Sequence, residues 1–198
     1  VAEHTDTVLA FGGMALKNSD VASGGISRHI ERDAMQRAAR RGAIFCGISP
    51  LRDDLPEEAG GRWLPIRVGT DVALMLALAY TLLAENLWDS AFVARYCTGF
   101  DIFERYLLGR DDGTPKDAAW AADITGIPAG TIIDLARRLP HGRTLITVSH
   151  SLQRAQYGEQ PVWMGAVLAA ALGQIGLPGG GFAYALGAIA YYGRRTNA

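Results

Sequence analysis

The sequence predicts an α/β fold in which an open parallel sheet is flanked by helices. Three apolar runs, at 7–13, 43–49 and 143–149, have the composition of buried strands. Between the first two lies the segment 29–42, with apolar residues at helical spacing and a terminal glycine. Strand, helix and strand at this spacing form a βαβ unit, so the first two strands should be parallel.

Most of the remaining chain is predicted to be helical. The run 72–86 is apolar almost all round, which indicates a buried helix, and Thr70 or Asp71 is a candidate N-cap for it. Further helices are expected at 89–96, 101–108, 119–126 and 127–140. The polar run 149–154 is interpreted as a loop before a long apolar helix, and the glycines at 179–181 are most simply the end of that helix.

Composition excludes several classes of function. The net charge of −1 over 198 residues gives no basic surface for nucleic acid. Two cysteines far apart, and four histidines without ligand spacing, indicate neither a disulfide framework nor a metal site. The apolar runs are too short for a membrane span, and no catalytic triad or carboxylate pair is identifiable. No signal within the chain assigns it to the cytoplasm or the periplasm.

The predicted strands each end in a loop rich in polar residues or glycine. In an open parallel sheet, ligands bind beyond the carboxyl ends of the strands, so these loops should share one edge. Lys17 and Arg154 in these loops would suit an anionic, nucleotide-like ligand. Each is also compatible with an ordinary surface residue, and Asp71 with a simple helix cap. Only Gly12 and Gly13 remain of a GxGxxG fingerprint, which disfavours an NAD-linked dehydrogenase.

Four segments together resemble one family. They are "GTDVALMLALAYTLL", "DGTPKDAAWAADITGIPAGTI", "LQRAQYGEQPVWM" and "LAAALGQIGLPGGGF". They resemble the molybdopterin-dependent oxidoreductases of the dimethyl sulfoxide reductase family, in particular the biotin sulfoxide, trimethylamine N-oxide and dimethyl sulfoxide reductases of bacteria. The resemblance runs in order from about residue 7 to residue 182.

The resemblance implies that the chain is an internal fragment of a larger, multi-domain enzyme. Residues 1–182 would form a Rossmann-like domain that binds molybdopterin guanine dinucleotide, and 183–198 would lead into a missing domain. The complete enzyme would hold molybdenum between two such dinucleotides and, with an electron donor, would remove oxygen from an S- or N-oxide substrate. The fragment alone is expected to be inactive, to hold no cofactor of its own, and to self-associate through apolar surface. The molybdenum ligand would lie outside it.

The family's cofactor contacts correspond to ten positions in this chain. They are Lys17, Asn18, Ile48, Ser49, Gly69, Thr70, Asp71, His150, Ser151 and Arg154. Asp71 would accept hydrogen bonds from the two adjacent donors of guanine, and Arg154 suits a phosphate or ribose oxygen. The alternative is a self-standing nucleotide-binding or interaction module without redox activity.

Overall fold

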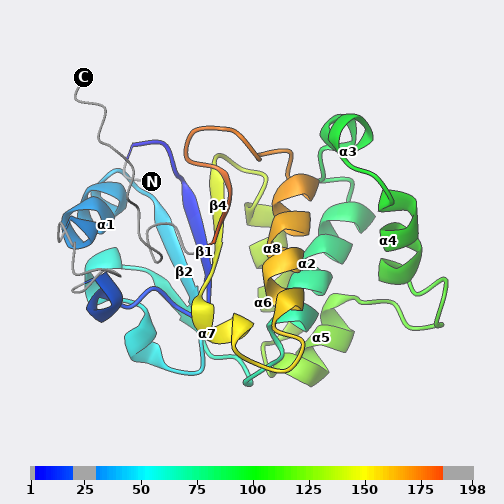
Figure 1. Cartoon of the computed structure of the whole chain (residues 1–198), viewed down its shortest axis with the longest axis horizontal. Helices are drawn as coiled ribbons and strands as arrows, with labels where there is room; N and C mark the ends of the chain where they lie inside the picture. Colours follow the sequence, from blue (N-terminus) through cyan, green and yellow to red (C-terminus); the bar gives the residue numbers. More distant parts are fainter. Residues whose placement is uncertain (1–2, 20–29, 185–198) are drawn as a thin grey trace.

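Five strands, all parallel, form a single sheet at the centre of the computed structural model, which describes residues 3–19 and 30–184 (Figure 1). The strands lie in the order β3-β2-β1-β4-β5. Their bounds are β1 Thr7–Phe11, β2 Ile44–Ile48, β3 Arg62–Leu64, β4 Thr144–Val148 and β5 Gly181–Tyr184. The predicted open parallel sheet with flanking helices is therefore confirmed.

Both faces of the central strand β1 are buried, and its side chains alternate between two cores. Leu9 and Phe11 belong to the larger core, whereas Val8 and Ala10 belong to the smaller one. A strand covered on both faces reads as an unbroken apolar run, which is why β1 was recognisable in the sequence.

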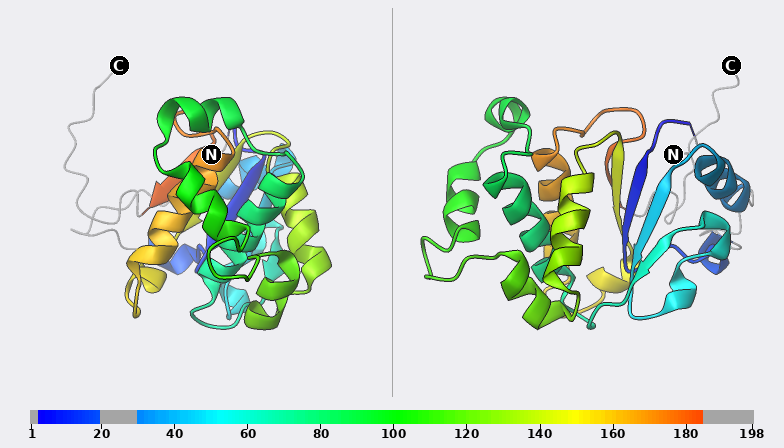
Figure 2. Two further views of the ribbon diagram at one scale, coloured as in Figure 1. Left: turned by 90° about the vertical axis from the view of Figure 1, so that its right-hand side faces the viewer. Right: turned by 180° about the vertical axis from the view of Figure 1, so that it is seen from behind.

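Helices cover the two faces unequally, as Figures 1 and 2 show. The smaller core lies under α1 (Glu31–Arg40) and a 3₁₀ turn, η3 (Glu57–Ala59). Four helices cover the larger core: α2 Asp71–Ala84, α5 Ala118–Thr125, α6 Ala129–Arg138 and α8 Glu159–Ala171. Two further helices, α3 Ser90–Tyr96 and α4 Phe100–Leu107, lie outside these four. Within the described residues, no helix has the length and apolar character needed to cross a membrane.

Local chemistry explains where several helices begin and end. The carboxylates of Asp89 and Asp117 each accept a hydrogen bond from the backbone N–H three residues on, at 2.8 Å, and so cap α3 and α5. Gly126 ends α5 in the left-handed conformation. These boundaries lie within one residue of the expected helices at 89–96 and 119–126.

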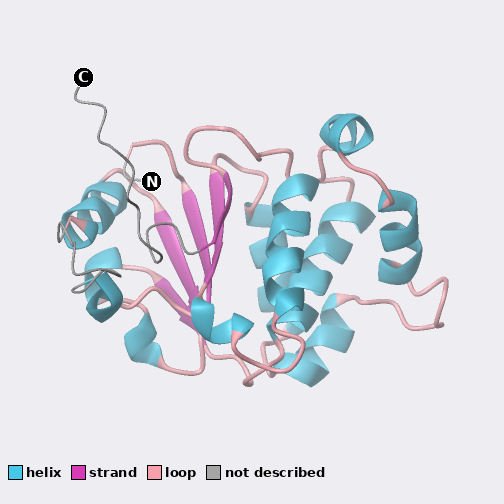
Figure 3. Ribbon diagram, viewed as in Figure 1, coloured by secondary structure: helices cyan, strands magenta, loops and turns pink. Residues whose placement is uncertain are grey.

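Three expectations need correction (Figure 3). The short edge strands β3 and β5 were not predicted. The polar run 149–154, interpreted as a loop, contains a one-turn helix, α7 (His150–Gln153). The long apolar helix ends at Ala171, well before the three glycines, and the last of these glycines begins β5.

The three glycines instead allow the chain to pass close to its neighbours. Gly179 has φ +80°, and a Cβ atom there would lie 2.7 Å from the backbone carbon of His4. A Cβ atom on Gly180 would lie 2.6 Å from Oε1 of Gln174. That buried amide receives a hydrogen bond from the Thr144 N–H at 2.7 Å and donates one to the Gly142 carbonyl at 2.8 Å. β5 ends at Tyr184. Residues 185–198, expected to lead into another domain, lie outside the described part of the chain.

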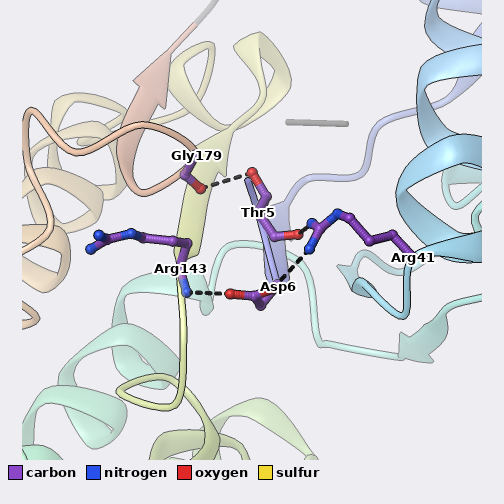
Figure 4. Close-up of polar contacts among 5 residues, drawn as sticks. All are labelled: Thr5, Asp6, Arg41, Arg143 and Gly179. Carbon is purple, nitrogen blue, oxygen red and sulfur yellow. Dashed lines mark hydrogen bonds and ion pairs between the residues drawn. The ribbon is translucent and has the colours of Figure 1, made fainter. Parts of the chain in front are cut away.

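A polar network holds the amino end of β1 (Figure 4). Asp6 accepts hydrogen bonds from the Arg143 backbone N–H at 2.8 Å and from the Arg41 guanidinium at 3.1 Å. These two donors lower the pKa of Asp6. Thr5 donates to the Gly179 carbonyl at 2.8 Å, and Arg41 also donates to the Thr5 carbonyl. One end of the sheet is thus tied to α1, to the start of β4 and to the loop before β5.

Close packing of α8 on the sheet gives a stability prediction. A Cβ atom at Gly165 would lie 2.6 Å from the Phe182 ring and 3.1 Å from Val148, whereas Gly130 in α6 has no neighbour within 4 Å of that position. We expect Gly165→Ala to lower the free energy of unfolding by about 1–3 kcal/mol. The matched control Gly130→Ala should raise it by about 0.4–1 kcal/mol. Urea denaturation measures both, and equal effects would contradict the close contact.

Candidate functional site at the carboxyl edge of the sheet

The central strands end at one level, so the loops that follow them begin side by side. Phe11 at the end of β1 pairs with Ile48 on one side and with Val148 on the other. The strand order changes direction between β1 and β4, because the chain builds outward from β1 to β3 and then returns to add β4. In parallel α/β sheets, the crevice beyond such a reversal is where ligands bind. Figure 1 shows α7 and the starts of α2 and α8 at this same edge.

The loops after β1 and β4 touch at Gly12. This glycine has φ +78°, and a Cβ atom there would lie 2.1 Å from the hydroxyl oxygen of Ser149 and 3.0 Å from that of Ser151. The N–H of Ser149 donates to the Phe11 carbonyl at 2.9 Å, and the two serine hydroxyls are hydrogen-bonded to each other. Only glycine combines this backbone conformation with this close approach.

The loop after β1 also touches the loop after β2, at Gly13. Its φ is +81°, and a Cβ atom there would lie 2.4 Å from Cβ of Asp54. The next N–H, that of Met14, donates to the Asp54 carbonyl at 2.7 Å. The loop after β1 is therefore held on both sides. Lys17 and Asn18 follow it in the chain and are exposed.

Asp71 begins α2 and is buried, with 3% of its surface exposed. The N-cap of α2 is Thr70, whose hydroxyl donates to the Arg67 carbonyl at 2.7 Å and makes no side-chain cap. The carboxylate oxygen Oδ1 of Asp71 is buried and has no hydrogen-bond partner among residues 3–19 and 30–184. Of the described residues, only Glu31 has another such atom.

Burial raises the pKa of Asp71 from 3.8 to about 6, and a hydrogen bond from its own backbone N–H opposes the shift only in part. A buried acceptor without a donor is costly, and in native proteins it calls for a specific explanation. A ligand that presents N–H donors to this oxygen would supply the missing partner. The geometry therefore fits a donor-bearing ligand better than a helix cap.

The other expected contacts fall into two groups. Gly69, Ser151 and Arg154 are exposed at this edge, and His150 at the start of α7 is half-buried. By contrast, Ile48 is fully buried and Ser49 is 2% exposed, so their side chains belong to the protein interior. The structure brings Ser151 close to Gly12. Among the described residues, no hydrogen bond joins Asp71 to the loop after β1.

The described residues contain no group of three or more His, Cys, Asp or Glu side chains arranged to hold a metal ion. Burial raises the pKa of the Cys46 thiol to about 12, so this cysteine is not a nucleophile at neutral pH.

Sequence reasoning did not select four residues that shape the site: Gly12, Gly13, Asp54 and Ser149. The glycines and Ser149 follow β1 and β4 directly, so their position after a buried strand was an available signal. Asp54 lies six residues beyond its strand, and nothing in the local sequence distinguishes it from Asp53.

Comparison with known proteins gives consistent results. The sequence profile described as molybdopterin oxidoreductase matches residues 2–197. The chain is 60% identical over 190 residues to trimethylamine-N-oxide reductase 1 of Escherichia coli K12, covering 93% of this chain and 22% of that protein. It is 46% identical over 189 residues to biotin sulfoxide reductase of Cereibacter sphaeroides, covering 96% of this chain and 25% of that protein. The chain thus spans about a quarter of the length of these relatives.

The fold is also similar to a solved structure, that of acetylene hydratase from Pelobacter acetylenicus. The TM-score is 0.70 at 23% sequence identity, over 88% of this chain and 22% of that one. At this identity the likeness supports the arrangement of the sheet and helices and carries no conclusion about activity.

The raised pKa of Asp71 predicts how stability depends on pH. Between about pH 4 and 6 the folded protein holds a proton that the unfolded chain has released, so the contribution of Asp71 to stability falls as pH rises. Asp71→Asn removes this titration. Relative to wild type, the variant should gain roughly 2 kcal/mol of stability between pH 4 and pH 8. Urea denaturation at each pH measures this difference, and a constant difference would mean that the carboxylate is not desolvated.

Proposed function

Because this chain belongs to the molybdopterin oxidoreductase family, we propose that it binds the nucleotide end of a molybdopterin guanine dinucleotide within a molybdenum S- or N-oxide reductase. The family implies a molybdenum–molybdopterin cofactor. The relatives described above, which act by their names on biotin sulfoxide and trimethylamine N-oxide, support the class of substrate. The cofactor would supply oxygen-atom transfer at the metal, and this chain would supply binding and orientation.

The observation that carries the proposal is the buried, unpartnered carboxylate oxygen of Asp71 at the carboxyl edge of the sheet. Guanine presents two adjacent donors, N1–H and the N2 amino group, and a carboxylate can accept from both. Adenine lacks this pair of donors and would leave the buried acceptor unsatisfied, so the same group that binds guanine also rejects adenine. An ionised Asp71 is the form that accepts both bonds.

The loops at this edge suit the rest of a dinucleotide. Gly12 and Gly13 let the loop after β1 pack closely between the loops after β2 and β4, so that all three loops lie together at this edge. Lys17 and Arg154 are exposed cations on the loops after β1 and β4, suited to phosphate or ribose oxygens. Asn18, Gly69, Thr70, His150 and Ser151 complete the set of proposed contacts.

We further propose that residues 1–182 act as a Rossmann-like binding domain within a longer bacterial enzyme that also needs an electron donor. None of these proposed contacts performs a chemical step, because each would bind the nucleotide and not the reacting centre. The chain by itself is expected to be inactive.

Nucleotide selectivity tests this proposal. The 198-residue chain should bind GDP more tightly than inosine diphosphate, which lacks the N2 donor, and more tightly still than ADP. Each lost hydrogen bond to the carboxylate should cost roughly 1.5–3 kcal/mol, or about ten- to a hundredfold in Kd. Isothermal titration calorimetry measures these affinities.

Two variants separate ligand binding from helix capping at the same position. Asp71→Ala and Asp71→Ser should both abolish the preference for GDP, although serine is a good cap. Wild-type GDP affinity in Asp71→Ser, with thermal stability lost only in Asp71→Ala, would leave Asp71 as a structural cap and refute the guanine role.

Apolar surface on the outer helices leads to a separate prediction. An apolar groove of about 440 Å³ lies between α2, α3, α4 and α8, and Trp163 on its rim is 67% exposed. Surfaces of this kind drive association. We expect the isolated chain to form dimers or larger species by light scattering, and Trp163→Gln to shift it towards monomer. A wild-type chain that stays monomeric over a wide concentration range would contradict this expectation.

A further inference from the structure

Ser49 and Asp54 form a hydrogen-bonded pair behind the loop that follows β1. The hydroxyl of Ser49, directly after β2, donates to Oδ2 of Asp54 at 2.5 Å. Asp54 is half-buried at the end of the 3₁₀ turn η2 (Arg52–Asp54). The pair therefore joins the end of a central strand to a turn five residues further on.

Every polar group of Ser49 is used within the protein. Its N–H donates to the Leu64 carbonyl at 3.3 Å, and its carbonyl accepts from the Trp63 indole N–H at 2.8 Å. Its hydroxyl oxygen, besides donating to Asp54, accepts from the Leu51 N–H at 3.3 Å. With its donors occupied and 2% of its surface exposed, Ser49 has nothing to offer a ligand directly.

Asp54 also contacts the loop after β1, so the Ser49–Asp54 pair is connected to that loop. Its carbonyl accepts from the Met14 N–H at 2.7 Å, and its Cβ and Cγ atoms occupy the space beside Gly13 that a side chain would need. Gly12 and Gly13 have no side chains with which to fix their own path. The wall formed by Asp54 on one side, and by Ser149 on the other, therefore determines where this loop runs.

We propose that Ser49 and Asp54 are positioning residues of the nucleotide site, which fix the loop after β1 for binding and do not touch the ligand themselves. This inference rests on the proposed function, and it assigns Ser49 a role different from the direct contact that the sequence suggested. Because the two side chains act through one hydrogen bond, removing either should have nearly the effect of removing both.

The test compares Ser49→Ala, Asp54→Ala and the double variant in the 198-residue chain. Asp53→Ala is the matched control, since Asp53 lies in the same turn but is exposed. Asp54→Asn is the conservative variant, because its amide oxygen can still accept from Ser49. The two readouts are hydrogen exchange at the Met14 amide without ligand and the Kd for GDP.

We expect the Met14 amide to exchange at least tenfold faster in both single variants, and the Kd for GDP to rise about five- to twentyfold. The double variant should resemble the singles, and Asp53→Ala and Asp54→Asn should resemble wild type. Unchanged Met14 exchange would overturn the proposal. So would faster exchange with unaltered GDP affinity, which would leave the proposed function intact. A wild-type chain that binds no GDP would instead refute the proposed function, and the positioning role with it.

Discussion

The close approach of backbone to side chain at Gly12 is the constraint on which the carboxyl edge depends. β1 lies at the centre of the sheet, so the loop after it must leave between the loops of β2 and β4. Ser149 closes one side at Gly12 and Asp54 closes the other at Gly13. A side chain at either glycine would force the neighbouring loop outward, because protein interiors do not absorb an added group without displacement. The three loops can pack together at this edge because two adjacent residues have no side chains.

The central part of the fold could be predicted from the sequence, whereas its edges could not. β1 and β2 are buried on both faces, and β4 is buried on one face and half-buried on the other, so all three read as largely apolar runs. The helices carry recognisable caps such as Asp89 and Asp117. The edge strands β3 and β5 have three and four residues, too few for any periodicity. They exist because β2 and β4 offer unpaired backbone groups, which is a property of the assembled sheet and not of their own residues.

The candidate site was predictable to a similar degree. Position after a strand was enough to select the three loops, whereas the start of a buried helix indicated only a cap at Asp71, and the family resemblance suggested its role as a ligand contact. That Asp71 lacks a partner, or that Ser49 is fully occupied by its neighbours, depends on contacts between segments distant in the chain. A residue type and its position indicate what a side chain can do, and only the packing decides whether its donors and acceptors are available.

The buried carboxylate of Asp71 also bears on the fate of the protein in a cell. Without a ligand, the Oδ1 atom of its ionised form has neither water nor a hydrogen-bond donor among the described residues, which lowers the stability of the empty protein at neutral pH. A ligand that donates to it stabilises the fold by mass action. If Asp71 binds a ligand as proposed, copies that have received none would unfold more often and would be the first to meet proteases. The unfavourable group in the proposed binding site would thereby mark unloaded copies for removal before they have encountered any substrate.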